Sequence, residues 1–390
     1  MSLKGKIMIY FDNAATSYPK PKEVSEAMLH FLEKVGASPG RSGHRLSIEA
    51  GRIIYRVRES LAELFNVDDP LRIIFTLNVT EALNLALKGL LRPGDQVITS
   101  SLEHNSIMRP LRELEKEGIE VELVSCSPKG FLEPQDIEKS IKKNTRLIVL
   151  NHGSNVIGSL LPITVVGEIA KRHDILFLVD TAQTAGCYPL DFKKDNIDLL
   201  AFTGHKALFG PQGTGGLVIG ERVNVKKLSP LKTGGTGSRS ESEEQPNFLP
   251  DIYESGTPNT VGLAGLNEGV RFVLKEGIDK IRQHELRLHQ KLVTGLKEIP
   301  GVIIYGEGQG KDRIAVISFN VKDQLPSEVG LKLNEEYDIM CRVGLHCSPV
   351  THKTIGTFPT GTVRFSMSWF NTFEEVDQVI MAVKNIAKEK

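Results

Sequence analysis

The feature that most constrains the fold is a unit that recurs through the middle of the chain: a short apolar run, a polar cluster and a segment with helical spacing. Residues 147–150 (LIVL) and 175–179 (ILFLV) are apolar at every position, which is typical of strands covered on both faces of a sheet. Leu83, Leu87 and Leu90 keep the spacing of one helix face. The alternation of such strands and helices predicts an α/β domain with a mostly parallel sheet.

Seven strands and four intervening helices are predicted in this part of the chain. The strands are expected at residues 72–76, 96–100, 120–125, 146–152, 175–183, 199–206 and 215–220. The helices are expected at residues 81–91, 104–118, 136–143 and 165–173. Only a short loop separates the last two strands, so that pair is compatible with an antiparallel arrangement.

The pattern of predicted strands and helices changes near residue 262. Two long helices are predicted at 265–277 and 279–299, and strand, helix and strand candidates follow at 313–321, 326–337 and 362–369. This pattern predicts a smaller α+β C-terminal domain of about 125 residues. We therefore expect a large domain at 16–261, and a small domain formed by 1–15 together with 262–390. The polar, Gly/Ser-rich stretch 229–248 is expected to be a mobile loop.

Composition excludes several classes of protein. The chain has 390 residues with 48 basic and 48 acidic side chains, so no general attraction to nucleic acid or to an anionic membrane is expected. No apolar run approaches the roughly 18 residues that span a bilayer, and the N-terminus has no signal-peptide pattern. Four cysteines without a CxxC pair do not suggest a disulfide scaffold. These features predict a cytoplasmic protein.

Polar clusters follow five of the predicted apolar strands. They are NVTEA, LEHNS, NHGSN, DTAQ and TGHK. Exposed loops are often polar for no functional reason. In open α/β sheets, however, ligands bind beyond the carboxyl ends of the strands. Five clusters in succession, each suited to an organic phosphate, favour a binding site at that edge.

Two of these clusters carry the chemistry of a specific cofactor. Asp180 follows a fully apolar strand, and Lys206 follows the next strand 26 residues later. Asp180 alone could be a helix cap, and Lys206 alone could be a surface residue. Together they match the layout for pyridoxal phosphate, in which the acid keeps the ring nitrogen protonated and a lysine of lowered pKa holds the aldehyde. GxGxxG is absent, which argues against a dinucleotide site.

Residues near these two positions are suited to a phosphate group. Val79 and Thr80 stand at a predicted helix N-terminus, where free N–H groups attract anions; capping the helix is an equally good interpretation. Thr203 and His205 flank the strand end that leads to Lys206 and could donate to a phosphate.

Cys347 lies among loop-type residues, in RVGLHCSPVTHK. A thiol there is a candidate nucleophile on a flexible loop bounded by Gly344 and Pro349. His346 could tune that thiol or be a surface residue. A metal site from His346, Cys347 and His352 would lack a fourth ligand, so no metal is predicted. The other three cysteines, Cys126, Cys187 and Cys341, are predicted to be structural.

The motifs of the chain, in their order, resemble those of class V aminotransferase-fold enzymes. They are DNAAT, NVTEALN, LEHNSI, NHGSNVIG, VDTAQTAG, TGHKALFGPQGTGG, ESGTPN, RVGLHCSP and VRFSMSWFNT. The combination resembles cysteine desulfurases, nearer the selenocysteine-lyase-like (SufS/CsdB) group than the NifS/IscS group. Leu345 departs from that group, which often has a second histidine there. The resemblance implies the pyridoxal-phosphate-dependent transferase fold of type I, with a seven-stranded sheet in the large domain, and a homodimer.

The resemblance also implies a set of site residues. Lys206, Cys347 and His104 would be catalytic, and His104 would also stack on the cofactor ring. The other cofactor contacts would be Val79, Thr80, Asp180, Gln183, Thr203, His205 and, from the partner subunit, Thr257. Substrate would meet Asn13, Ala14, His44, Asn155 and Arg364, of which Asn155 and Arg364 would hold its carboxylate.

The implied activity is removal of sulfur from L-cysteine, which leaves L-alanine and a persulfide on Cys347 for transfer to an acceptor protein. Three alternatives stay open. A selenocysteine lyase would use the same pocket. An epimerase or aminotransferase of the same fold would not need Cys347. A non-enzymatic pyridoxal phosphate scaffold would not need Lys206 and Arg364 intact.

Overall fold

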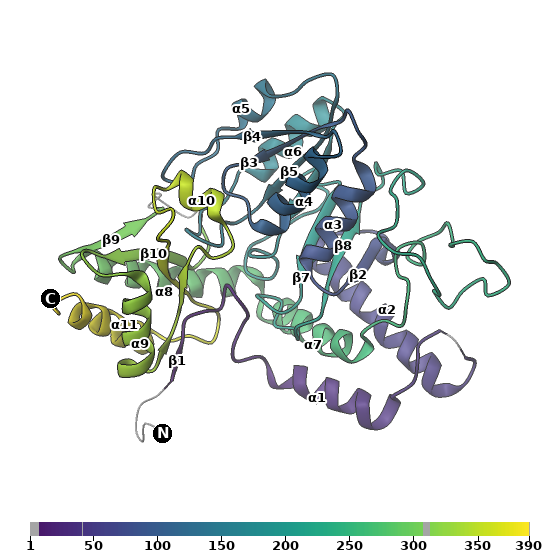
Figure 1. Cartoon of the computed structure of the whole chain (residues 1–390). Coiled ribbons are helices and arrows are strands. Elements are labelled where there is room, and N and C mark those ends of the chain that lie inside the picture. Colours follow the sequence, from purple (N-terminus) through teal and green to yellow (C-terminus); the bar gives the residue numbers. More distant parts are fainter. Residues whose placement is uncertain (1–7, 41, 307–312, 390) are drawn as a thin grey trace.

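A computed structural model describes residues 8–40, 42–306 and 313–389. Its centre is a seven-stranded sheet of order β2-β8-β7-β6-β5-β3-β4, visible in the upper part of Figure 1. The strands are β2 (Ile73–Thr76), β3 (Gln96–Ser100), β4 (Glu120–Val124), β5 (Thr145–Asn151), β6 (Leu176–Asp180), β7 (Leu199–Thr203) and β8 (Gly215–Ile219). All neighbouring pairs are parallel except those of β8, which runs antiparallel to β2 and β7. The predicted sheet is confirmed, including its antiparallel last pair.

The continuous apolar strands are explained by two cores, one on each face of this sheet. In β5, Ile148 and Leu150 belong to one apolar cluster, while Leu147 and Val149 belong to the other, because successive side chains of a strand point to opposite faces. The first cluster also contains residues of α2 (Arg45–Phe65), α6 (Ile163–Arg172) and α7 (Thr260–Glu276). The second contains residues of α3 (Val79–Leu90) and α4 (Asn105–Glu115). The remaining helices of this part are α1 (Lys22–His30), a π-helical turn Phe31–Val35, a 3-10 turn Pro70–Arg72 and α5 (Pro134–Lys139).

The C-terminal part forms a second, antiparallel sheet of order β12-β13-β10-β9, on the left in Figure 1. Its strands are β9 (Val302–Tyr305), β10 (Val316–Val321), β12 (Arg342–Gly344) and β13 (Thr362–Ser366). Its helices are α8 (Ile278–Lys297), α9 (Pro326–Tyr337), α10 (Pro349–Thr354) and α11 (Phe373–Ile386). The N-terminal strand β1 (Ile9–Tyr10) pairs in parallel with β11 (Ile339–Met340). The start of the described chain therefore joins the C-terminal part.

The predicted boundary at 261/262 falls inside α7. Leu266, Val270 and Val273 of that helix belong to the apolar cluster on one face of the large sheet. The core of the C-terminal part contains Ile9 and Phe11 of the N-terminal segment, and otherwise takes its residues from Leu288 of α8 onwards. The predicted helix 136–143 is shorter than expected, ending at Lys139. Across the described segments, no helix combines the length and apolarity needed to cross a membrane.

Candidate active site

Asp180 and Lys206 are brought together at the carboxyl edge of the large sheet. Asp180 is the last residue of β6 and is buried, with Oδ1 accepting a hydrogen bond from the Ala182 N–H at 2.9 Å. Burial raises the pKa of Asp180, and the Ala182 N–H and the Lys206 ammonium oppose that rise. A cationic partner that faces a buried acid lowers the pKa of that acid and favours its ionised form.

Lys206 lies in the turn that follows β7 and has an unusually low pKa. Burial lowers the pKa of its amine to about 8, with Asp180 opposing this shift and Arg364 and Arg342 adding to it. A sizeable fraction of the amine is therefore neutral near neutral pH, and only a neutral amine can attack a carbonyl. The charges that act on Lys206 come from both domains, so the site lies where they meet.

His104 supplies an uncharged ring to the same site. It is the N-cap of α4, and its Nδ1 accepts from the Ser106 N–H at 3.1 Å. Burial lowers its pKa to about 3, and Lys206, Arg342 and Arg364 add to that shift. The ring is therefore neutral, with its proton on Nε2 because Nδ1 is used as an acceptor.

Two of the predicted phosphate-binding residues, Val79 and Thr80, lie at the start of α3, beside the start of α4. The hydroxyls of Thr80 and Ser106 are 2.8 Å apart, which joins the two helix N-termini. Ser106 was missed by the sequence analysis, although it lies in the LEHNSI cluster; its hydroxyl also contacts His104 Nδ1 at 2.8 Å. Val79 is buried at the first position of α3.

His205 and Thr203 lie beside Lys206 and have spare hydrogen-bonding capacity. His205 Nδ1 is buried without a partner in the described part of the chain, and burial lowers the pKa of His205 to about 4. Thr203 Oγ1 makes only a long contact of 3.5 Å, to the Thr214 carbonyl. Lys20, which the sequence analysis missed, donates to the His205 carbonyl at 3.2 Å, and burial lowers its pKa to about 8.

Arg364 reaches the site from β13 and is almost completely buried. Its Nη2 lies 2.6 Å from Oδ1 of Asp12, and its Nη1 donates to the Asn155 carbonyl at 2.9 Å. Its Nε has no partner within the described residues. The Asp12 carboxylate, which the sequence analysis missed, thus occupies one edge of the guanidinium that was predicted to hold a substrate carboxylate.

Asn155 does not present a free amide. Its Nδ2 donates to the His346 carbonyl at 2.7 Å, and its Oδ1 accepts from the Ser348 hydroxyl at 2.8 Å. The side chain predicted to bind substrate therefore binds both neighbours of Cys347.

Cys347 is exposed and lies in a tight turn between β12 and α10. Its Sγ is 3.5 Å from Nη2 of Arg342, and its carbonyl accepts from the Asn105 N–H, the residue after His104, at 2.8 Å. The sequence predicted a flexible loop here; the structure shows instead a hydrogen-bonded turn packed on the N-terminus of α4. This places the thiol next to the residues that surround Lys206.

The sequence left two interpretations of His346, and the one that placed it on the surface is wrong. It is buried, its Nε2 lies 3.0 Å from the Thr362 hydroxyl, and burial lowers its pKa to about 2. Its ring centroid is 5.4 Å from that of His352, which is also buried. Among the described residues, no group of three or more His, Cys, Asp or Glu side chains could hold a metal ion.

The N-terminal segment closes one side of the site. Gln183 Nε2 donates to the Ala14 carbonyl at 3.0 Å, and the Ala14 N–H donates to the Ser366 hydroxyl at 2.8 Å. Asn13 uses its amide to bind Ser366, Asn371 and the backbone of residues 10 and 18. Asn13, Ala14, Gln183 and Lys206 line one cavity. Asn13 therefore anchors the segment, and Gln183 ties it to the loop after β6.

The family model described as aminotransferase class-V matches residues 9–379. The chain belongs to the class-V aminotransferase family.

Several relatives and structural neighbours of the chain are named as cysteine desulfurases. A probable cysteine desulfurase from Pyrococcus abyssi is 35% identical over 98% of this chain and 94% of its own length. A probable cysteine desulfurase from Methanothermobacter thermautotrophicus is 33% identical over 97% of this chain and 94% of its own. The apo structure of a cysteine desulfurase from Thermococcus onnurineus matches with a TM-score of 0.92 and 35% identity, covering 98% of this chain and 95% of that chain.

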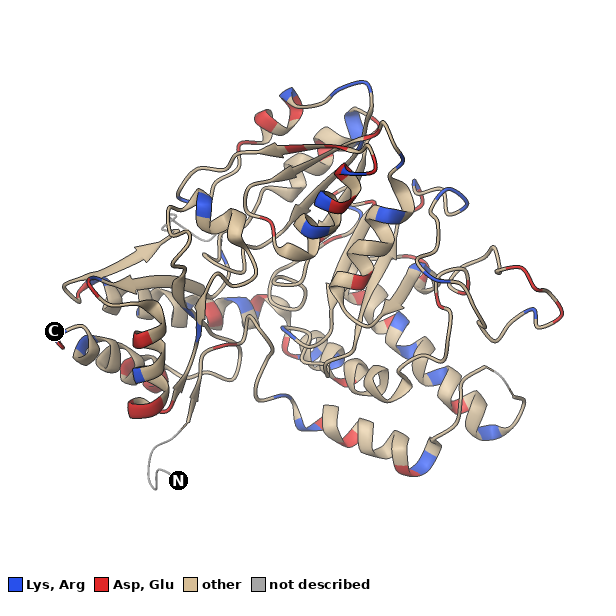
Figure 2. Cartoon of the chain, viewed as in Figure 1, with Lys and Arg blue, Asp and Glu red and all other residues tan. Residues whose placement is uncertain are grey.

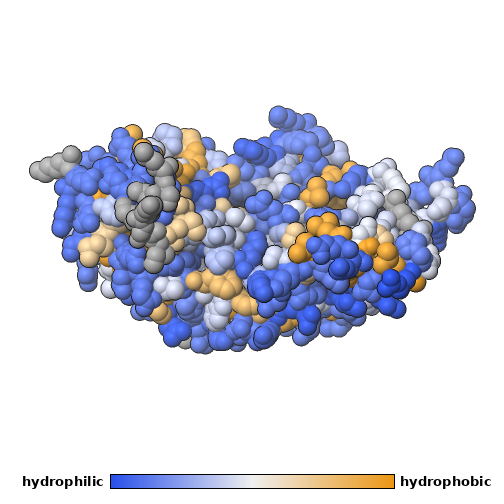
Figure 3. Space-filling model, turned by 90° about the horizontal axis from the view of Figure 1, so that it is seen from below, coloured by the Kyte–Doolittle hydropathy of each residue, from blue (hydrophilic) through white to orange (hydrophobic). Residues whose placement is uncertain are grey.

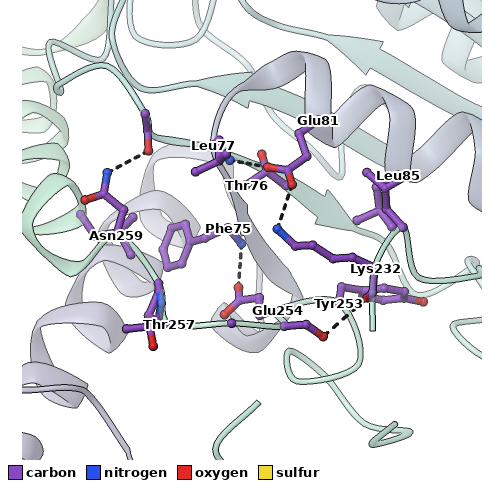
Figure 4. Close-up of a pocket in the computed structure, with 16 residues that line it drawn as sticks. Phe75, Thr76, Leu77, Glu81, Leu85, Lys232, Tyr253, Glu254, Thr257 and Asn259 are labelled. Carbon is purple, nitrogen blue, oxygen red and sulfur yellow. Dashed lines mark hydrogen bonds and ion pairs between the residues drawn. The ribbon is translucent and has the colours of Figure 1, made fainter. Parts of the chain in front are cut away.

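Two predicted residues, His44 and Thr257, do not line the cavity that contains Lys206. His44 is the exposed N-cap of α2, in the peripheral connection between α1 and α2 (Figure 1). Thr257 is exposed beside the start of α3, in a pocket shown in Figure 4. There Glu254 accepts from the Phe75 N–H at 2.6 Å, and Lys232 pairs with Glu81 at 3.0 Å.

Basic side chains surround the thiol and the substrate side of the site. Arg342 and Arg364 both act on Lys206 and His104, and Arg109 acts on His104. The acidic groups that act on Lys206 are Asp180 and Asp12. Figure 2 shows the wider distribution, in which both signs are interspersed over the helices. An anionic substrate is therefore favoured locally, although the chain as a whole is neutral.

Proposed function

We propose that this chain is a cysteine desulfurase that uses pyridoxal 5'-phosphate. The single observation that carries the proposal is the position of the exposed Cys347 thiol, on a turn bonded to the helix that begins at His104 and Asn105. A class-V aminotransferase that only moved an amino group or inverted a centre would not need that thiol. The relatives named above support the same activity.

The residues present fit the proposed cofactor. The unpartnered Nδ1 of His205 and the loosely held hydroxyl of Thr203 offer donors to a phosphate, as do Thr80 and the N-terminus of α3. Asp180 would hold the pyridine nitrogen in its protonated form, and the neutral His104 ring would lie against the cofactor ring. Pyridoxal phosphate supplies an aldehyde for an amine and an electron sink for the bonds at the substrate α-carbon.

Each protein group then has a definable task. Lys206, whose low pKa leaves part of its amine neutral, would hold the cofactor and would accept the α-proton of the substrate. Arg364 binds the substrate carboxylate through the edge that includes its unpartnered Nε. Gln183 and the N-terminal segment close the site against water.

Cys347 completes the reaction as the sulfur acceptor. Its thiolate forms a bond to the substrate sulfur while the bond between that sulfur and the β-carbon breaks. The electron pair of the broken bond stays with the carbon, which takes up protons and leaves as L-alanine. The sulfur remains on Cys347 as a persulfide, and because the residue is exposed, an acceptor protein can collect it.

The decisive experiment measures alanine and persulfide together. With L-cysteine, the purified protein loaded with pyridoxal phosphate is expected to release one alanine for each persulfide formed on Cys347, detected by mass spectrometry of the intact chain. Cys347→Ala is expected to lose both products and to keep the cofactor absorbance. Cys341→Ala is the matched control, since Cys341 is half-buried and burial raises its pKa to about 12. If Cys347→Ala kept full activity, the epimerase or aminotransferase alternative would replace this proposal.

A homodimer is part of the same proposal. Leu29 and Leu32, at the end of α1 and in the turn that follows, are 55% and 61% exposed, and Ile48 and Tyr55 of α2 are 46% and 45% exposed. Figure 3 shows apolar patches on the underside of the molecule, the face that carries α1. Exposed apolar side chains that form a contiguous patch are typical of a contact surface. The same contact would bring His44 and Thr257, which do not line the cavity of Lys206 in their own chain, close to the partner's site. Sedimentation at micromolar concentration tests this.

The compartment and the acceptor also remain proposals. The four cysteines are free thiols, which supports a reducing compartment such as the cytoplasm. The acceptor is proposed to be a protein that offers its own thiol or sulfur-binding site to Cys347. Selenocysteine is the closest alternative substrate, and relative turnover of the two amino acids would separate the activities.

A further inference from the structure

The turn that carries Cys347 has an unfavourable backbone conformation. His346 and Cys347 have φ angles of 48° and 58°. Two consecutive residues that are not glycine rarely adopt this left-handed region, because Cβ crowds the following carbonyl. The turn therefore persists only if neighbouring groups hold it.

A single side chain holds both neighbours of Cys347. The Asn155 amide donates from Nδ2 to the His346 carbonyl at 2.7 Å and accepts at Oδ1 from the Ser348 hydroxyl at 2.8 Å. Asn155 is itself fixed, because its carbonyl accepts from Nη1 of Arg364 at 2.9 Å. Asn155 and Ser348 are both buried, so water competes poorly for these bonds.

Other hydrogen bonds fix the main chain of the turn and leave the Cys347 side chain exposed. The Ser348 N–H donates to the Leu345 carbonyl at 2.8 Å, and the Asn105 N–H donates to the Cys347 carbonyl at 2.8 Å. His346 is held separately by the Thr362 hydroxyl. The Cys347 side chain is exposed and lies against Arg342.

We propose that Ser348 and Asn155 form a latch that positions the Cys347 thiol for attack on the substrate sulfur, with Ser348 as a positioning residue of the reaction. The part of this inference that concerns the reaction rests on the proposed desulfurase function. Correct placement of a nucleophile contributes heavily to rate, and a displacement of about 1 Å can cost about a hundredfold. Ser348 acts only through Asn155 and the turn, so its loss lowers kcat and spares the binding of L-cysteine.

The test compares Ser348→Ala with Ser60→Ala in the full-length protein loaded with pyridoxal phosphate. Ser60 is the matched control because its hydroxyl also lies against an amide oxygen, that of Asn267, at 3.0 Å. Ser60 is in α2 and Asn267 in α7. Alanine fits wherever serine fits, so both variants are expected to fold. Ser348→Ala is expected to lower kcat for alanine release about tenfold, the order expected for one buried hydrogen bond, with KM within about twofold. Ser60→Ala is expected to change neither.

Amide hydrogen exchange gives a second readout that needs no activity. In Ser348→Ala, the amides of Ser348 and Asn105 are expected to exchange at least about fivefold faster, because opening of the turn becomes easier; Ser60→Ala is expected to leave them unchanged. Unchanged exchange at these amides would overturn the latch, as would a normal kcat in Ser348→Ala. If the wild type makes no alanine, the desulfurase proposal fails, and the exchange result still decides whether the latch exists.

Discussion

The ion pair between Asp12 and Arg364 offers a sharp test of how the two ends of the chain are held together. Asp12 is the first residue of the DNAAT motif, and Arg364 is the centre of β13; their charged atoms are 2.6 Å apart. The side chain of Arg364 is 1% exposed and that of Asp12 is 21% exposed. We expect Asp12→Asn to remove the charge with little change of shape, leaving a buried guanidinium without its counter-ion.

The size of the effect follows from this burial. Breaking a fully buried ion pair by removing one partner costs about 3–5 kcal/mol. Here Arg364 keeps its bond to the Asn155 carbonyl and Asp12 is partly hydrated, so we expect a loss of about 2–3 kcal/mol. With an unfolding entropy of about 2.1 cal/mol/K per residue, that corresponds to about 3 °C in Tm if the whole chain unfolds together. The shift is about three times larger if the small domain unfolds first.

Thermal unfolding of the cofactor-free protein, followed by calorimetry, measures this shift. Asp68→Asn is the control, because the Asp68–Lys193 pair is exposed on both sides and surface pairs contribute little. No resolvable change in its Tm is expected. A Tm of Asp12→Asn within about 1 °C of the wild type would refute the argument that this pair stabilises the junction of the N-terminal segment with β13.

Two further predictions concern protons. Because the pKa of Lys206 is lowered to about 8, the rate at which the cofactor-free protein takes up pyridoxal phosphate is expected to rise with pH, with a midpoint near pH 8. Stopped-flow absorbance measures this rate. A midpoint near the pKa of an ordinary lysine would contradict the burial of the amine. Burial raises the pKa of Glu103 to about 8, above its value in the unfolded chain. Between about pH 4.5 and 8, the folded state therefore binds a proton that the unfolded state has lost. The free energy of unfolding falls as pH rises through that window, by up to about 1.4 kcal/mol per pH unit. Glu103→Gln should therefore lose less Tm than the wild type between pH 5.5 and 7.5, and parallel losses in the two proteins would show that Glu103 does not titrate there.

The parts of the site that the sequence predicted are those with a local signature. Asp180 and Lys206 each follow an apolar strand, and the carboxyl ends of parallel strands meet at one edge of the sheet. His104 belongs to the cluster after β3 on the same edge. The strands were recognised from periodicity, so the polar residues that follow them were expected at one edge of the sheet. The role of His104 was given only by the resemblance.

The rest could not be predicted because it depends on polar contacts between distant segments. Asn155 binds residues 191 and 193 positions away, and Asp12 meets Arg364 across 352 positions. An asparagine or an aspartate in a polar loop has the same local appearance whichever partner it finds. The flexible loop expected around Cys347 was inferred from Gly344 and Pro349, but the bonds that fix this turn come from other elements.

The hydrogen bonds that Asn155 already makes limit how a substrate carboxylate can be bound. Both polar atoms of its side chain already hold the Cys347 turn, whereas Arg364 retains an unpartnered Nε within the described part of the chain. A carboxylate that enters the site therefore meets Arg364 first, in competition with Asp12. It can take Asn155 only by breaking a bond to a neighbour of Cys347. Binding of a carboxylate and the position of the Cys347 thiol are in this way linked through one carboxamide. The residue that the resemblance assigns to substrate binding holds, in this structure, the turn that carries Cys347.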